Sequence, residues 1–211
     1  MVAIDGPAGA GKSAVGHRVA EALGLPFVDS GHFYRAVSQL AREEGVDAGD
    51  VPRLVAIASR PELRAAGELI LDGDRDLTEL IHRPEINENL SAVSRVAEVR
   101  DAINQRLRRL AGRGIVMVGR DIGTVVFPDT PHKVFLTASL DERVRRRLAQ
   151  KAKRGDSANA VEMEREIAAR DVADSTRTVA PLRPASDAIS IDTDGLSLDE
   201  VVGSILELIR R

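Results

Sequence analysis

A short glycine-rich segment near the start of the sequence constrains the fold more than any other feature. Residues 6–13 read GPAGAGKS and match the pattern G-x-x-x-x-G-K-[ST]. An apolar run at 1–5 comes directly before this segment, and an amphipathic pattern with helical spacing follows it at 11–23. A loop with this pattern binds phosphate when it connects a buried strand to a helix. The sequence therefore predicts a strand, a phosphate-binding loop and a helix in its first 23 residues.

The residue types in this loop suit a nucleoside triphosphate. Glycines at three positions let the backbone N–H groups of 8–12 converge on a phosphate, next to the positive end of the helix. Lys12 is placed to bridge the β- and γ-phosphates, and the Ser13 hydroxyl to coordinate Mg²⁺. ATP or GTP with magnesium is the expected ligand, and a glycine-rich turn without a ligand is the alternative. The residues expected to contact it are Gly6, Pro7, Ala8, Gly9, Ala10, Gly11, Lys12, Ser13 and Ala14.

Short apolar runs alternate with amphipathic stretches along the chain. This pattern is typical of a parallel sheet with helices on both faces, a three-layer α/β sandwich. Five strands are expected, at 1–5, 26–29, 114–119, 133–138 and 188–192. The expected helices cover 11–23, 31–44, 139–153, 160–174 and 197–210.

A long interval separates the second and third expected strands. More than eighty residues lie between them, far more than the dozen or so that a parallel crossover needs. We therefore predict an inserted α+β subdomain at about 45–105 within a single domain of 211 residues. It should contain a hairpin over 68–78 and a long helix over 94–111. The arginine-rich stretch at about 140–157 is predicted to form a short mobile lid.

Composition argues against several classes of protein. The net charge of −3 does not suit a general nucleic-acid or membrane binder. Cysteine is absent, which excludes disulfides, and the four histidines lie far apart without metal-ligand spacing. No apolar run approaches the roughly 18 residues of a membrane span. We expect a cytoplasmic monomer with neither nucleic acid nor a membrane as its partner.

Three polar segments point to a second ligand beside the triphosphate. DSGHFYR at 29–35 and VGRDIGTVVFPD at 118–129 lie at the carboxyl ends of expected strands, where open parallel sheets bind ligands. RDVADSTR at 170–177 spaces three charged residues so that they share one helix face. A guanine-reading N-K-x-D segment is absent. Several arginines around a second anion are what a phosphoryl transferase needs.

These segments, together with GPAGAGKS and VAPL at 179–182, resemble the signature of the bacterial cytidylate kinases, a family of nucleoside monophosphate kinases. The resemblance covers nearly the whole chain. It implies a P-loop NTPase fold whose inserted subdomain binds the monophosphate, and transfer of the γ-phosphoryl group of ATP to CMP or dCMP in pyrimidine nucleotide metabolism. The alternatives are another small-molecule P-loop kinase, acting on UMP, another monophosphate or a shikimate-like acid, and a non-catalytic ATP-sensing module.

The resemblance also implies roles for residues of the second site. Ser30 would contact the acceptor base and Tyr34 would lie against the nucleotide, with a helix cap and core packing as the alternatives. Arg35 would clamp the acceptor phosphate, or would be a solvated helix arginine. Ser94 and Arg100, both expected on the long helix, would reach the sugar and the pyrimidine. The alternative for Arg100 is an ion pair with an acidic neighbour on its own helix.

Five further residues of the second site follow from the same resemblance. Asp121, next to Arg120, would accept from the cytosine 4-amino group, which uracil lacks. Arg170 and Asp174 resemble a pentose-binding pair, and Arg177 a residue near the base and phosphates. A surface salt bridge with i, i+4 spacing is the alternative for this group.

The arginine run at 143–147 would bring Arg146 or Arg147 over the donor phosphates, although such runs are usually solvated faces. The group expected to act in catalysis is Lys12, Arg120, Arg146, Arg147 and Arg177. One departure concerns the metal, because Val118 stands where the family usually has an acidic residue. The expected metal ligand is Ser13, with water and Asp29 as further contributors.

Overall fold

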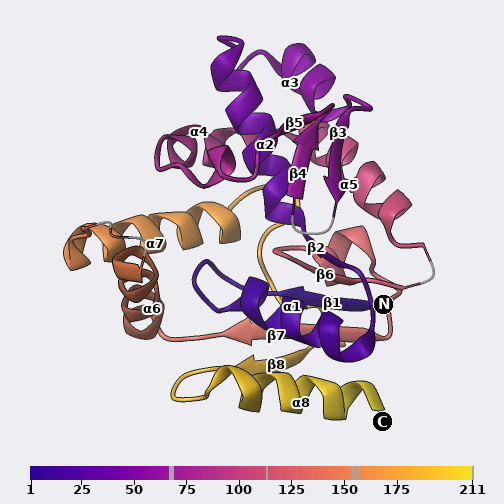
Figure 1. Cartoon of the computed structure of the whole chain (residues 1–211), viewed down its shortest axis with the longest axis vertical. Helices are drawn as coiled ribbons and strands as arrows, with labels where there is room; N and C mark the ends of the chain where they lie inside the picture. Colours follow the sequence, from indigo (N-terminus) through magenta and orange to yellow (C-terminus); the bar gives the residue numbers. More distant parts are fainter. Residues whose placement is uncertain (67–68, 113, 154, 156, 211) are drawn as a thin grey trace.

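The computed structural model describes residues 1–66, 69–112, 114–153, 155 and 157–210. At its centre is a five-stranded parallel sheet with the order β2-β6-β1-β7-β8 (Figure 1). The strands are β1 (Val2–Asp5), β2 (Phe27–Asp29), β6 (Val116–Gly119), β7 (His132–Thr137) and β8 (Ile189–Asp192). The five expected strands and the α/β fold class are confirmed.

Alternation of side chains along the strands explains why both faces of the sheet are apolar. In β1, Val2 and Ile4 belong to one core cluster and Ala3 belongs to the other. Val118 and Met117 of β6 divide between the two clusters in the same way. Strands β1 and β6 therefore bury every residue and must be covered by helices on both faces, whereas the edge strand β8 is largely exposed.

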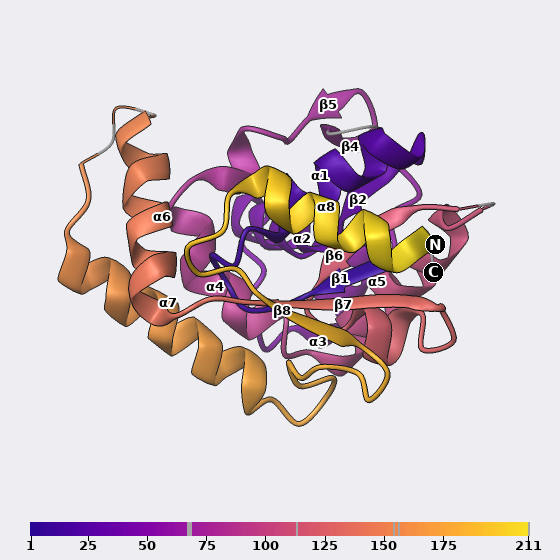
Figure 2. The ribbon, with the colours of Figure 1, turned by 90° about the horizontal axis from the view of Figure 1, so that it is seen from below.

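Helices α1 (Lys12–Leu23) and α8 (Leu198–Arg210) cover one face and contact each other; Figure 2 shows α8 in yellow. A Cβ at Gly16 of α1 would lie 2.4 Å from Cγ1 of Val118, so the glycine lets this helix pack closely on β6. On the opposite face lie α2 (Ser30–Glu43) and α5 (Ala97–Leu110). The sheet is the middle of three layers.

The chain between β2 and β6 also contains a second, three-stranded antiparallel sheet. Besides α2 and α5, this part of the chain forms α3 (Val51–Ala58), β3 (Leu63–Ala66), β4 (Leu69–Asp72), β5 (Arg75–Asp76), the short η1 (Leu80–His82) and α4 (Glu85–Val93). The expected hairpin corresponds to β4 and β5, although its first residue, 68, lies outside the described residues. Gly73 in the turn has a φ of 62°, which favours glycine. Strand β3 and helices α3 and α4 were not predicted from the sequence.

The long helix expected over 94–111 is shorter than predicted. Helix α5 begins at Ala97, Val96 before it has φ −69° and ψ 116°, and Ser94 is the C-cap of α4. The placement of Ser94 on the long helix is therefore wrong. The apolar spacing runs through Val96 and Val99 without a gap, so periodicity could not reveal the break.

The predicted lid contains α6 (Leu140–Lys153), which is followed by α7 (Ala160–Ser175). The two helices contact each other and extend beyond the central sheet in both views (Figures 1 and 2). Residues 154 and 156 of the predicted lid lie outside the described residues. None of the described helices combines the length and the apolar character that a membrane span requires.

Candidate active site

Three strands end together at one edge of the central sheet. The register pairs Asp5 of β1 with Gly119 of β6, and Asp29 of β2 with Val118. The phosphate loop, the first turn of α2 and the segment 120–121 therefore all begin at this edge. Open parallel sheets bind their ligands at such an edge.

The backbone of the phosphate loop depends on its glycines. Gly6, Gly9 and Gly11 have φ angles of 149°, 81° and 86°, which side chains disfavour. A Cβ at Gly6 would lie 2.2 Å from the carbonyl oxygen of Leu136. Helix α1 begins at Lys12, so its free N–H groups face the loop. The loop thus has the geometry of an anion-binding turn.

The Lys12 side chain reaches back to the loop. Its Nζ donates to the carbonyl oxygen of Pro7 over 2.6 Å, and the residue is buried. Burial and, next, the nearby charge of Arg120 lower the pKa of Lys12. A buried cation of this kind gains stability when an anion binds beside it.

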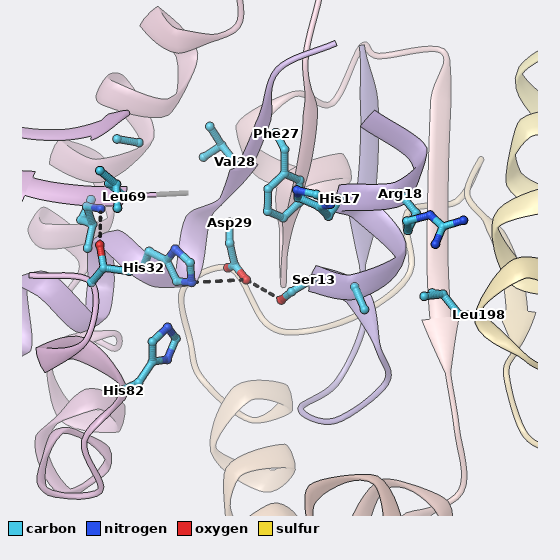
Figure 3. A pocket seen from close by; sticks show the side chains of 14 residues that line it. Ser13, His17, Arg18, Phe27, Val28, Asp29, His32, Leu69, His82 and Leu198 are labelled. Atoms are coloured by element: carbon cyan, nitrogen blue, oxygen red, sulfur yellow. Dashed lines mark hydrogen bonds and ion pairs between the residues drawn. The ribbon is translucent and has the colours of Figure 1, made fainter. Parts of the chain in front are cut away.

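Ser13 and Asp29 bring two oxygens together beside the loop. The Ser13 hydroxyl donates to Oδ2 of Asp29 over 2.6 Å (Figure 3). Asp29 also caps α2 by accepting from the N–H of Gly31. Burial would raise the pKa of Asp29, but His32, the Ser13 hydroxyl and other neighbours together lower it. A hydroxyl and an ionised carboxylate are oxygen ligands of the kind Mg²⁺ prefers, so these residues fit that ion.

Val118 supplies no oxygen to this position, because its side chain is a hydrocarbon; it is buried in the core against Gly16. In the part of the chain that the structure describes, no group of three or more histidines and carboxylates could hold a metal ion. A magnesium ion at Ser13 would thus take further ligands from the nucleotide and from water.

A pocket of about 460 Å³ opens beside Ser13 and Asp29, between α1 and β2 on one side and the three-stranded sheet on the other (Figure 3). His17, His32 and His82 line it together, although they are far apart in the sequence. The arginines predicted to bind the acceptor do not line this pocket. The pocket adjoins the proposed metal position at Ser13 and Asp29 and is separate from the predicted acceptor site.

Six charged side chains form what we call the arginine–aspartate cluster. Its members are Arg100, Arg120, Asp121, Arg170, Asp174 and Arg177. Nη2 of Arg100 lies 2.5 Å from Oδ2 of Asp121. Nε of Arg120 and Nε of Arg170 lie 2.9 and 3.3 Å from Oδ2 of Asp174. Arg177 lies 3.8 Å from a carboxylate oxygen of each aspartate. Four cations against two anions leave an excess of positive charge, which suits a phosphate.

Burial sets the electrostatics of the cluster. Burial and the nearby charge of Arg100 lower the pKa of Arg177. For Asp174, which is 2% exposed, burial acts to raise the pKa, but Arg120, Arg170 and Arg177 together lower it. The i, i+4 pair of Arg170 and Asp174 does form, but inside the cluster and not at the surface.

The sequence predicted that Arg177 shares one helix face with Arg170 and Asp174, and this prediction is wrong. Helix α7 ends at Ser175, and Thr176 is its C-cap. Nε of Arg177 donates to the carbonyl oxygen of Ala180 over 2.5 Å, and Ala180 has a φ of 52°. The turn after the helix therefore directs Arg177 into the cluster.

Three buried polar atoms in or next to the cluster make no hydrogen bond within the described residues: the Tyr34 hydroxyl, Nε of Arg100 and Nη2 of Arg177. Nη2 of Arg177 lies 3.8 Å from Oδ1 of Asp121, which is an ion pair but too long for a hydrogen bond. The Tyr34 ring packs in the core and lies under the Arg100 guanidinium, whose Cζ is 5.1 Å from the ring centroid. Because buried polar atoms are nearly always hydrogen-bonded, these three atoms indicate a polar ligand.

Arg35 extends from α2 toward the insert. Its Nη1 donates to the carbonyl oxygen of Ile81 and to Oδ1 of Asn87, over 3.2 and 3.1 Å. Burial first, and then Arg147 and Arg170, lower the pKa of Arg35 to about 10. Arg35 is therefore not a solvated helix arginine, and it lies in the same positive region as the cluster.

Ser30 and Ser94 are both buried. A Cβ at Gly119 would lie 2.5 Å from Oγ of Ser30, so this hydroxyl packs against the end of β6. The carbonyl oxygen of Ser94 accepts from Nη1 of Arg100 over 3.0 Å. Arg100 pairs with Asp121, and not with an acidic neighbour on its own helix as the alternative proposed.

The role of Arg143 was not predicted from the sequence. This buried side chain donates from Nη1 to the carbonyl oxygen of Ala8 over 3.2 Å and to Asp171 over 2.5 Å. A Cβ at Gly9 would lie 3.0 Å from the Cβ of Arg143, so α6 packs directly on the phosphate loop. Its i, i+4 spacing from Arg147 was the available signal, because it places both arginines on one helix face.

The two arginines favoured by the sequence differ in their surroundings. Arg146 donates to the carbonyl and hydroxyl oxygens of Thr193, and its Nη1 would lie 3.8 Å from a Cβ at Gly11. The charge of Arg147 contributes to the lowered pKa of Lys12. Both therefore lie near the phosphate loop.

Replacing Arg143 with alanine is expected to raise the KM for ATP about tenfold, because it leaves Asp171 and the Ala8 carbonyl without their donor and frees the loop. Arg145→Ala is the matched control, since Arg145 is exposed and pairs with Glu142 on the same helix. Steady-state kinetics should show a KM change below about twofold for the control. Equal effects of the two substitutions would contradict the assignment.

A triphosphate-binding loop alone suits many proteins, but a second buried cationic cluster at the same sheet edge defines a P-loop phosphotransferase. Comparisons with known proteins agree. Residues 2–211 match the family model described as cytidylate kinase. A cytidylate kinase of Exiguobacterium sibiricum is 44% identical, and the alignment covers 99% of this chain and 96% of that protein. A cytidylate kinase of Cupriavidus necator is 43% identical, and the alignment covers 98% of this chain and 94% of that protein.

The chain belongs to the cytidylate kinase family, and it is an enzyme of the phosphotransferase class. The resemblance noted in the sequence is thereby confirmed. A solved structure of an uncharacterised protein from Eubacterium ventriosum has a TM-score of 0.54 and 14% identity, and covers 99% of this chain and 97% of that chain. At this identity the likeness shows a shared fold alone.

Proposed function

We propose that the chain transfers the γ-phosphoryl group of ATP to CMP or dCMP, giving ADP and CDP or dCDP. One observation carries the proposal: the Tyr34 hydroxyl and Nη2 of Arg177 are buried without a hydrogen bond at a cluster with excess positive charge. A nucleoside monophosphate offers hydrogen-bonding groups and an anion in one molecule. Membership of the cytidylate kinase family supports cytidine as the nucleoside.

On the donor side, residues 6–14 would hold the phosphates of ATP. Lys12 would exchange its bond to Pro7 for the β- and γ-phosphate oxygens. Ser13 and Asp29 would hold Mg²⁺, which neutralises charge on the same oxygens. Arg146 and Arg147 would close over the transferring group.

On the acceptor side, Arg35, Arg120 and Arg177 would bind the phosphate, since guanidinium groups match its geometry. Asp121 would accept from the cytosine 4-amino group, where uracil presents a carbonyl that a carboxylate cannot bind. The remaining contacts would be Ser30, Tyr34 and Arg100 with the base, and Ser94, Arg170 and Asp174 with the sugar.

Such a reaction needs no covalent intermediate, because the acceptor phosphate is already an anion. The side chains position two anionic ligands and stabilise the charge of the transferring group. Closure of the inserted subdomain at 45–105 and the lid at 140–157 would exclude water and suppress ATP hydrolysis. The proposal places the enzyme in pyrimidine nucleotide metabolism, as a cytoplasmic monomer without a nucleic-acid partner.

A coupled assay of ADP formation tests the proposal. ATP is supplied with CMP, dCMP, UMP, AMP, shikimate or no acceptor, and ADP should form fastest with CMP or dCMP. Turnover confined to another acceptor would favour a different small-molecule kinase. ATP binding without acceptor-dependent turnover would favour an ATP-sensing module.

A further inference from the structure

Asp5 links the two halves of the site and has no role in the reaction described so far. It is the last residue of β1 and directly precedes the phosphate loop. Its carboxylate is buried, with the residue 5% exposed. Oδ1 accepts from the N–H of Ile122 over 2.8 Å, and Oδ2 accepts from the N–H of Gly123 over 2.7 Å. These bonds connect residues 117 and 118 positions apart.

The two N–H groups belong to the segment that presents acceptor residues. They lie at the start of η2 (Ile122–Val126), a short helical turn directly after Arg120 and Asp121. The ladder between β1 and β6 ends at the pair of Asp5 and Gly119, so residues 120–123 have left the sheet. The Asp5 carboxylate continues the connection between β1 and this segment where the ladder stops.

Burial of Asp5 disfavours the ionised form of its carboxylate. Burial raises the pKa of Asp5 to about 6, although both N–H bonds and Lys12 act to lower it. An isolated buried carboxylate is costly, and apolar residues of similar size usually serve a core as well. Gly123 leaves room for the contact, because a Cβ there would lie 3.4 Å from Oδ2 of Asp5 and 3.2 Å from Cγ of Lys133.

We infer that Asp5 is a positioning residue for phosphoryl transfer: it holds the Arg120–Asp121 segment at a set place relative to the phosphate loop. This inference rests on the proposed function, in which the loop binds the donor and the segment binds the acceptor. A misplacement of about 1 Å between reacting groups costs roughly 100-fold in rate. Loss of the two bonds would permit a shift of that order.

The test is a double-mutant cycle of Asp5→Asn and Arg120→Ala, read out as kcat and as kcat/KM for CMP. An asparagine keeps the shape of Asp5 but can offer its oxygen to one of the two N–H groups only. Asp5→Asn should lower kcat by about 30-fold or more in the natural sequence, with the KM for ATP changed much less. In the Arg120→Ala background, where the positioned arginine is gone, the same substitution should cost less than about threefold.

Near-normal kcat for Asp5→Asn, or the same loss in both backgrounds, would overturn the inference, since a general structural effect is additive.

Asp50→Asn is the matched control, because Asp50 also accepts from a backbone N–H, that of Arg53, outside the site. Thermal unfolding checks that each variant is folded. If Asp5→Asn is unfolded, Asp5→Glu takes its place in the cycle, because it keeps the charge and displaces the carboxylate. The natural sequence in the same assay tests the proposed function separately. If it is inactive with CMP, the proposed function is rejected, and the role of Asp5 that rests on it is rejected as well.

Discussion

Replacing Lys12 with alanine is expected to lower kcat about 1,000-fold or more while the chain stays folded, a loss of roughly 4 kcal/mol of transition-state stabilisation. The Lys12 ammonium group lies within the phosphate loop and donates to the carbonyl oxygen of Pro7. Its removal would take away the cation nearest to the transferring phosphoryl group. Because burial already disfavours this charge, the free energy of unfolding should change little.

The measurement is steady-state kinetics with CMP and ATP, accompanied by thermal unfolding. Lys153→Ala is the matched control, because Lys153 is an exposed lysine in the last turn of α6. The control should retain full kcat. A Lys12→Ala variant with near-normal kcat would show that residues 6–13 are a glycine-rich turn and not the donor site.

Replacing Asp121 with asparagine is expected to reduce the preference for CMP over UMP about tenfold or more, measured as the ratio of the two kcat/KM values. The carboxylate accepts from the 4-amino group of cytosine, whereas an asparagine amide can also donate to the 4-carbonyl of uracil. The variant should therefore lose activity with CMP and gain relative activity with UMP.

The same substitution should also destabilise the fold. Asp121 is the partner of Arg100 at 2.5 Å, and both side chains are at most 5% exposed. Removing one partner of a buried ion pair costs roughly 3–5 kcal/mol, so the midpoint of unfolding should fall. Saturating nucleotide stabilises the folded variant during the kinetic measurement. Asp101→Asn, at an exposed position of α5, is the control and should change neither property. An unchanged ratio in a folded Asp121→Asn variant would refute the role in base choice.

The central sheet was predictable because its signals are local. A strand buried on both faces is a continuous apolar run, and each of the five runs corresponds to one strand. The phosphate loop was equally visible, since its glycines, lysine and serine are adjacent in the chain and act through their own backbone.

The insert was less predictable. Strand β3 is held by its pairing with β4, and its residues Leu63–Ala66 carry no strong alternation of their own. The break between α4 and α5 depends on Ser94 and Val96, which interrupt the helix without interrupting the apolar spacing. Periodicity measures which face of a helix is apolar and contains no information about where its axis changes direction.

In the site, the residue types that follow each strand can be read from the chain, and the parallel sheet brings those positions to one edge. The partners of the charged residues depend on the three-dimensional packing. Asp174 is shared by Arg120 and Arg170 because α7, which packs on α4 and α6, brings it to the arginine that follows β6, and Arg143 reaches Ala8 because α6 packs on the loop. The physical reason is that a charge takes the partner nearest in space, and the long-range packing of helices on the sheet decides which partner is near.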